Sequence, residues 1–180
     1  IREKYSMIDQ PKIVDLKESH LGIVGEKEIL CRQLKILTSR IACFQSYHDL
    51  RMIVIYDKEY EDEFQWMRWL PHVRIPALNM FGMVSSERTR DLVLGSMGRI
   101  LKERAEHLKE REKGSKGNYL PHYLFLIQEP SWIMDHGIME YLRMEGKEMG
   151  FSVIYIGDVS ANLPEYIGTV LQVENSEEGR

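Results

Sequence analysis

The chain has 180 residues, of which 43% are apolar and 29% charged, a balance typical of one soluble globular domain that can bury a sizeable core. A net charge of −4 and a pI near 5.9 argue against nucleic acid as a direct partner, because domains that bind it usually carry a basic face. No run reaches the roughly 18 apolar residues of a membrane span, and the first residue is Ile rather than Met, so we expect a fragment of a longer chain with any membrane attachment elsewhere.

Buried strands are predicted where apolar residues run continuously, and the chain has five such runs. They cover residues 21–24, 50–56, 122–130, 151–158 and 168–173. The weak pattern of residues 76–84 predicts a loop or a short strand.

Helices are predicted between these runs, where apolar residues recur every three or four positions. The first extends from Glu26 to about residue 44, and a second follows a Ser86 cap and runs to about residue 113. Another covers residues 137–149, and the aromatic segment 64–73 forms a helix that must break at Pro71.

This alternation predicts a three-layer α/β/α fold whose mainly parallel, five-stranded sheet is covered on both faces. We expect a single domain over residues 1–180, with flexible ends at 1–10 and 174–180. Residues 114–118, GSKGN, are the candidate mobile loop.

Several smaller features carry no catalytic signal. Cys31 and Cys43 share the first helix about 18 Å apart, too far for a disulfide, and we expect both to be reduced and buried. Gly95 and Gly98 suggest the close approach of a second helix to the long one. The six histidines show no ligand spacing, and no Cys/His cluster predicts a zinc site.

The turn after the first strand raises the question of a phosphate-binding loop. A Walker A loop has the pattern G-x-x-x-x-G-K-[ST], but counting from Gly25 places Leu30, Cys31 and Arg32 at its last three defined positions. Lys27 lies only two residues past Gly25, and the helix begins at once. Glu26 and Glu28 oppose an anion at the helix amino terminus, so a tight strand-helix turn is the favoured interpretation.

A dinucleotide-binding interpretation has less support. The stretch GIVGEKE keeps Gly22 and Gly25 but lacks G-x-G-x-x-G. Asp57 follows the second strand, where a ribose-binding acid would lie, but acids are common in turns.

The end of the third strand resembles a Walker B strand, in which an acid holds the magnesium shell and a following Glu polarises water. Gln128 occupies the first of these positions and is a poor magnesium ligand, whereas Glu129 keeps the second. A strand that ends at a polar turn before Pro130 explains the same residues equally well. Separately, Trp66 and Trp69 suggest either core packing or a partner surface.

Taken as a set, several segments resemble the membrane-bound type VII secretion ATPases, EssC in Firmicutes and EccC in mycobacteria, of the FtsK/SpoIIIE class of ring motors. The segments are VDLKESHLGIVG, FQSYHDLRMIVIYD, WMRWLPH, PHYLFLIQEPSWIM, GFSVIYIGD and NLPEYIGTVLQV. The resemblance covers nearly the whole chain, and it is strongest to the domain between the membrane segment and the first full ATPase module.

The resemblance implies a RecA-like P-loop fold with strand order 5-1-4-3-2. By position, Gly25, Glu26, Lys27 and Glu28 replace the Walker A loop, Gln128 and Glu129 replace the Walker B acids, and Gly157 and Asp158 stand at a polar sensor. Each position departs from what hydrolysis needs. ATP and magnesium are the family's ligands, but we expect none to bind tightly here.

The leading hypothesis is a non-hydrolysing structural and regulatory adaptor in a protein-export motor, at the cytoplasmic face of the membrane. Its partners would be other ATPase modules, other machine subunits and exported small helical proteins; the full protein would form a ring and this fragment a monomer. One alternative is a weak ATP-binding or hydrolysing module that uses Glu129 and Lys27. Another is a plain partner- or substrate-binding module.

Overall fold

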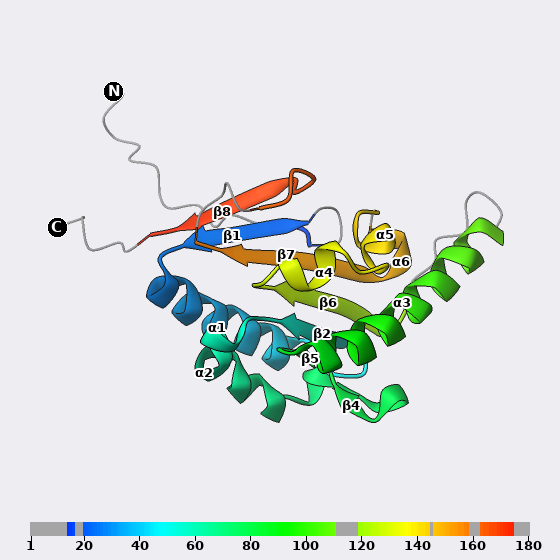
Figure 1. The fold of residues 1–180 in the computed structure, drawn as a ribbon, viewed down its shortest axis with the longest axis horizontal. Coiled ribbons are helices and arrows are strands. Elements are labelled where there is room, and N and C mark those ends of the chain that lie inside the picture. The colour runs from blue at the N-terminus through cyan, green and yellow to red at the C-terminus, as the bar shows by residue number, and fades with distance from the viewer. Residues whose placement is uncertain (1–13, 17–19, 111–118, 145, 159–162, 175–180) are drawn as a thin grey trace, which may run out of the picture.

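The computed structural model describes residues 14–16, 20–110, 119–144, 146–158 and 163–174. Within them a six-stranded sheet forms the centre of the molecule (Figure 1). In chain order its strands are β1 (Leu21–Gly25), β2 (Leu50–Ile55), β5 (Met83–Val84), β6 (His122–Ile127), β7 (Phe151–Gly157) and β8 (Thr169–Val173). A two-stranded antiparallel sheet pairs β3 (Arg74–Ile75) with β4 (Met80–Phe81).

The main sheet has the order β5-β2-β6-β7-β1-β8, and every neighbouring pair is parallel. The five predicted strands therefore lie in the predicted order 5-1-4-3-2. The two-residue strand β5 adds a sixth at the edge beside β2, within the segment for which the sequence left a loop or a short strand open. Six parallel strands, rather than five, make up the sheet.

Helical segments cover both faces of this sheet. The long helices are α1 (Lys27–Phe44) and α3 (Glu87–Glu110), and the short ones are α2 (Glu61–Phe64), α4 (Ser131–Met134), α5 (Met139–Leu142) and α6 (Gly146–Met149). Four 3-10 turns complete the described elements: η2 (Lys58–Tyr60), η3 (Gln65–Trp69), η4 (Pro71–Val73) and η5 (Pro76–Leu78).

Two apolar cores form because successive strand residues point to opposite faces. On β2, Met52 and Val54 join a core with α1, α2, η3 and η4, whereas Ile53 and Ile55 join a core with α3, α4, α5 and α6. This arrangement confirms the three-layer α/β/α class.

The start of α3 confirms the predicted cap. The Ser86 side chain accepts a hydrogen bond from the Thr89 amide at 3.3 Å, and the Thr89 hydroxyl accepts one from the Ser86 amide at 3.1 Å. This reciprocal arrangement satisfies backbone donors that the first helical turn leaves without intrahelical partners.

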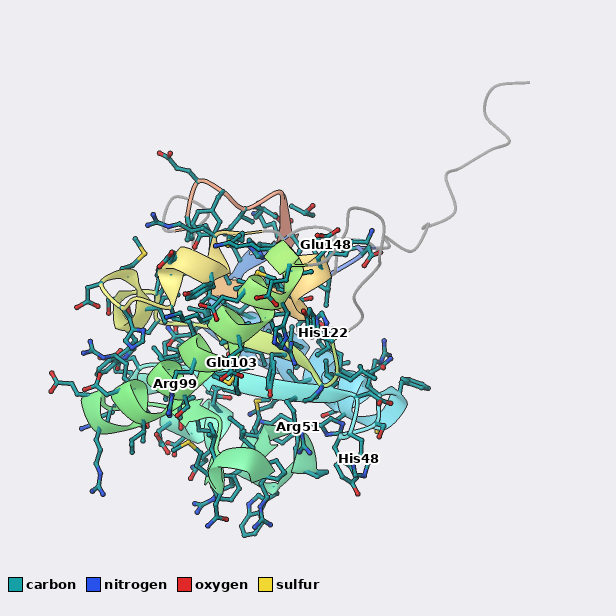
Figure 2. The ribbon with its side chains drawn as sticks, turned by 90° about the vertical axis from the view of Figure 1, so that its right-hand side faces the viewer. His48, Arg51, Arg99, Glu103, His122 and Glu148 are labelled. Carbon is teal, nitrogen blue, oxygen red and sulfur yellow. The ribbon has the colours of Figure 1, made fainter. Side chains whose placement is uncertain are left out.

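Two buried arginines fix the amino ends of the strands, the edge that faces the viewer in Figure 2. Arg51 of β2 donates to the carbonyls of Pro71 and Arg74 at 2.8 and 2.7 Å. Arg104 of α3 donates to the carbonyls of Met149 and Pro121 at 2.9 and 2.8 Å. Each thereby joins segments that are distant in sequence.

Four sequence-based expectations were wrong in detail. Residues 137–149 do not form one helix but α5 and α6, because α6 packs against the start of β7, where a Cβ at Gly146 would lie 2.1 Å from the Phe151 carbonyl oxygen. The segment 64–73 does break at Pro71, but mostly into 3-10 turns. Cys43 is exposed, although Cys31 is buried.

The fourth concerns Gly95 and Gly98, where a Cβ would meet no atom within 4 Å among those described, so no helix packs closely against them. The predicted mobile loop at 114–118, and nearly all of both predicted flexible ends, lie outside the described residues.

Candidate functional site

A cleft of about 420 Å³ lies at the carboxyl ends of the parallel strands. In open α/β sheets this edge is where ligands generally bind. The lining residues come from α1, η2, the ends of β6 and β7, and the segment before β8: Leu30, Tyr60, Gln128, Glu129, Pro130, Ser131, Ile156, Gly157, Asp158 and Leu163. The chain therefore has a hollow at the edge of the sheet where α/β folds generally bind ligands.

The turn that would cradle phosphates is too short to do so. β1 ends at Gly25 and α1 begins at Lys27, so a single residue separates strand from helix. A Cβ at Gly25 would lie 2.6 Å from the Val173 carbonyl oxygen, so the backbone here packs tightly against β8. Glu26, at the N-cap position, makes no side-chain cap, and both Glu26 and Glu28 are exposed.

Lys27 contacts the 3-10 turn η2 and is not one of the residues that line the cleft. Its Nζ lies 4.2 Å from the centroid of the Tyr60 ring and 3.4 Å from the Glu59 carbonyl oxygen. A cation over an aromatic face in this geometry is attracted by the ring quadrupole. The lysine thus attaches η2 to the first turn of α1.

The two residues that the resemblance compares with Walker B acids, Gln128 and Glu129, both accept hydrogen bonds from the backbone. The Gln128 side-chain oxygen accepts a hydrogen bond from the Asp57 amide at 3.0 Å, which connects the end of β6 to the second residue after β2. The Glu129 carboxylate accepts one from the Ser131 amide at 3.0 Å, at the start of α4. Asp57, the candidate ribose-binding acid, uses its carboxylate on the Glu59 amide at 2.9 Å, as expected of an acid in a turn.

Acidic groups dominate the electrostatics of the cleft. Among the described residues that line it, Glu129 and Asp158 are the acids and none is a lysine or arginine. Burial raises the pKa of the Tyr60 phenol, and the charges of nearby groups that include Asp158 and Glu129 raise it further. Among the described lining residues, no cation offsets the repulsion that these carboxylates exert on a polyphosphate.

The two tryptophans differ in their burial. Trp66 is half-buried against the α1-side core, whereas Trp69 is 82% exposed on η3, with the Arg68 guanidinium 5.7 Å from its ring centroid. Only Trp69 is available to a partner surface. In the part of the chain that the structure describes, no group of three or more His, Cys, Asp or Glu side chains could hold a metal ion.

Sequence reasoning missed Tyr60, Ser131 and Leu163 as lining residues. Tyr60 is the one aromatic residue within the acidic segment 57–63, which was a usable signal. Ser131 and Leu163 have no such signal, because only the packing of α4 and of the approach to β8 brings them to the cleft.

The sheet order and the position of the cleft define a domain of the P-loop NTPase type, in which the loop after β1 is reduced to a turn. No family model matches the sequence. Solved structures agree with the fold: EssC (ATPases 2 and 3) from Geobacillus thermodenitrificans superposes with a TM-score of 0.65 at 15% identity, over 91% of this chain and 34% of that one. The cytoplasmic domain of EssC gives 0.64 at 13% identity, over 91% and 34%.

Sequence relatives are closer. The type VII secretion system protein EssC of Staphylococcus aureus (strain MSSA476) is 32% identical over 179 residues, which are 98% of this chain and 12% of that protein. The ESX secretion system protein EccC of Geobacillus thermodenitrificans (strain NG80-2) is 34% identical over 169 residues, 94% of this chain and 11% of that protein. The chain belongs to the EssC/EccC family and spans about an eighth of the length of these relatives.

Proposed function

We propose that this domain is a non-hydrolysing, structural and regulatory adaptor within a type VII secretion motor. The observation that carries the proposal is the cleft: the hollow of a nucleotide site persists, yet its lining contains two carboxylates and no basic residue among those described. The residues that would serve ATP chemistry instead bond to their own fold, as Gln128 does to the Asp57 amide.

The family supplies the context of this proposal. EssC and EccC are secretion proteins, and one related structure is the cytoplasmic domain of the Thermomonospora curvata type VII secretion ATPase EccC. We propose that this domain lies at the cytoplasmic face of the membrane and couples the membrane anchor to the active ATPase modules of a ring. No helix among the described residues is long and apolar enough to cross a membrane.

Calorimetric titration with ATP and magnesium tests the proposal. We expect no heat of binding at millimolar nucleotide, which means that any binding free energy is weaker than about −4 kcal/mol. A dissociation constant in the micromolar range, about −8 kcal/mol, would contradict the proposal, because it requires a phosphate cradle.

A weak ATPase is the second candidate, because Glu129 lies in the cleft and Lys27 stands beside Tyr60 at its rim. Glu129 would activate water, and Lys27 would have to leave Tyr60 to reach a phosphate. Magnesium-dependent phosphate release by the purified domain, abolished by Glu129→Gln and retained by the exposed-site control Glu148→Gln, would support this candidate over the first.

A partner-binding module is the third candidate, and the 82% exposure of Trp69 is the observation that favours it. Exported helical proteins and neighbouring ATPase modules are the proposed partners. Binding should be measured by calorimetric titration of the domain with a purified neighbouring module. Trp69→Ala should abolish it, whereas Phe81→Ala, at an exposed position on β4, serves as the control.

A further inference from the structure

A small cavity lies between α1 and the segment that runs from α2 into η3. Its volume is about 10 Å³, the size that accommodates one water molecule. Apolar side chains of the α1-side core form part of its wall, and the polar side chains that line it are Cys31, Lys35, Thr38, Glu63 and Trp66. Every lining residue, together with its neighbours along the chain, belongs to the part that the structure describes.

The Trp66 side chain brings a hydrogen-bond donor that has no acceptor. Its Nε1 atom is buried, and no described atom accepts a hydrogen bond from it. A buried donor left in this way is costly, and folded proteins satisfy nearly all such groups with protein atoms or with ordered water. Because Trp66 lines the cavity, an acceptor held there is the one that can serve the indole.

Two side chains that line the cavity offer oxygen atoms as acceptors. Thr38 is 1% exposed, and its hydroxyl donates to the Leu34 carbonyl at 2.7 Å, so toward the cavity this oxygen can only accept. The Glu63 carboxylate pairs with Lys35 Nζ at 2.7 Å and, being ionised, has further lone pairs. A cavity of this volume holds one small molecule, so the groups around it share that molecule.

We propose that this cavity is a hydration site, in which one water molecule accepts a hydrogen bond from Trp66 Nε1 and donates to Thr38 Oγ1 and the Glu63 carboxylate. Three hydrogen bonds are the usual number for a buried water. The water connects α1 to η3, the turn on which Trp69 is exposed. This inference does not rest on the proposed function, since it concerns the interior of the domain and not the cleft.

Nuclear magnetic resonance of the 180-residue chain tests the site directly. The Trp66 indole proton, assigned by its loss in Trp66→Phe, should show a cross-peak to water that changes sign between laboratory-frame and rotating-frame Overhauser spectra. A bound water gives this change of sign, whereas chemical exchange with solvent does not. The exposed Trp69 indole should show exchange only. Absence of a water cross-peak at the Trp66 indole, or one of the exchange type alone, overturns the inference.

A matched pair of variants on α1 identifies the acceptor. Thr38→Val keeps a similar volume but removes the hydroxyl, so the water cross-peak of the Trp66 indole should disappear. Ser39→Ala removes an exposed hydroxyl from the next residue and should leave the cross-peak unchanged. A cross-peak that persists in Thr38→Val, or that both variants abolish, would refute Thr38 as a partner of the water.

Hydrogen exchange measures the consequence for η3. The Leu70 amide donates to the Met67 carbonyl at 2.9 Å and closes this turn. Its exchange should be faster in Thr38→Val than in the wild-type chain, and Thr38→Ser, which keeps the acceptor, should restore the wild-type rate. Equal rates in Thr38→Val and the wild-type chain would contradict the proposed connection between α1 and η3.

Discussion

At the scale of single residues, positions that resemble catalytic ones have structural tasks. Gln128 stands where the family resemblance implies a magnesium-binding acid, and its side-chain oxygen accepts a hydrogen bond from the Asp57 amide. An aspartate would be one methylene shorter and charged. The glutamine is therefore explained by the architecture of the strand ends, without any ligand.

The first prediction concerns this bond. Gln128→Leu removes the acceptor and leaves the Asp57 amide without it, so the free energy of unfolding should fall by about 1–2 kcal/mol in urea denaturation. Gln33→Leu, at an exposed position on α1, should change it by less than about 0.5 kcal/mol. Equal effects of the two substitutions would show that the Gln128 bond contributes nothing specific.

The second prediction compares two glycines. Gly25→Ala brings a Cβ to 2.6 Å from the Val173 carbonyl oxygen, and the strain should destabilise the fold by about 1–3 kcal/mol. Gly98→Ala lies in the α3 helix with no described atom within 4 Å of the new Cβ, and it should stabilise by about 0.5–1 kcal/mol. Opposite signs in thermal and chemical denaturation are the expected result; destabilisation by Gly98→Ala would reveal a packing partner.

At the scale of elements, long-range side-chain bonds hold helices and strand ends together. Arg104 projects from α3 and donates to carbonyls just before β6 and β7, and its guanidinium lies 5.1 and 4.9 Å from the Tyr119 and Tyr123 ring centroids. Burial lowers the pKa of this guanidinium, which nevertheless stays charged at neutral pH.

The third prediction follows from these contacts. Arg104→Met keeps the apolar volume but leaves buried carbonyls without donors, so the free energy of unfolding should fall by about 2–4 kcal/mol. Arg104→Lys should rescue little, because an ammonium does not reproduce the planar fork. Lys102→Met, on the exposed side of the same helix, is the control, and faster hydrogen exchange near Met149 should accompany only the Arg104 changes.

The fourth prediction concerns the junction around His20, whose ring stacks on Phe151 and meets Tyr166 edge-on. Burial lowers the pKa of His20 below its usual 6.5, so the unfolded chain binds a proton more readily than the fold does. This contribution to stability is full above pH 6.5 and is lost as the pH falls from there through the folded pKa.

Melting temperatures measured between pH 7.5 and pH 5.5, at intervals of about half a unit, should therefore decline more steeply for the wild-type chain than for His20→Phe. His48→Phe, at an exposed position, should follow the wild-type slope. Parallel curves for wild type and His20→Phe would contradict the assignment.

At the scale of the whole molecule, the architecture of a P-loop domain surrounds a cleft whose described lining contains two carboxylates and no lysine or arginine. The parallel sheet, its order and the hollow at its carboxyl edge are intact. The surface instead carries exposed apolar side chains such as Trp69 on η3. These features agree with a domain that acts through its surfaces.

The sequence by itself determined the α/β class, the five long strands and the two long helices, because continuous apolar runs and helical periodicity are local signals. It also indicated the short turn at Gly25, since the spacing to Lys27 leaves no room for a loop. The order of the strands came from the family resemblance, because periodicity alone does not specify which strands pair.

Only the tertiary structure decided how the side chains of the candidate site are used. The contact between Lys27 and Tyr60, and the bond between Gln128 and the Asp57 amide, join residues that are distant in sequence, so no local pattern encodes them. The division of residues 137–149 into two short helices likewise depends on the approach of Gly146 to β7. Local periodicity specifies elements, whereas packing between elements decides where their ends and polar groups lie.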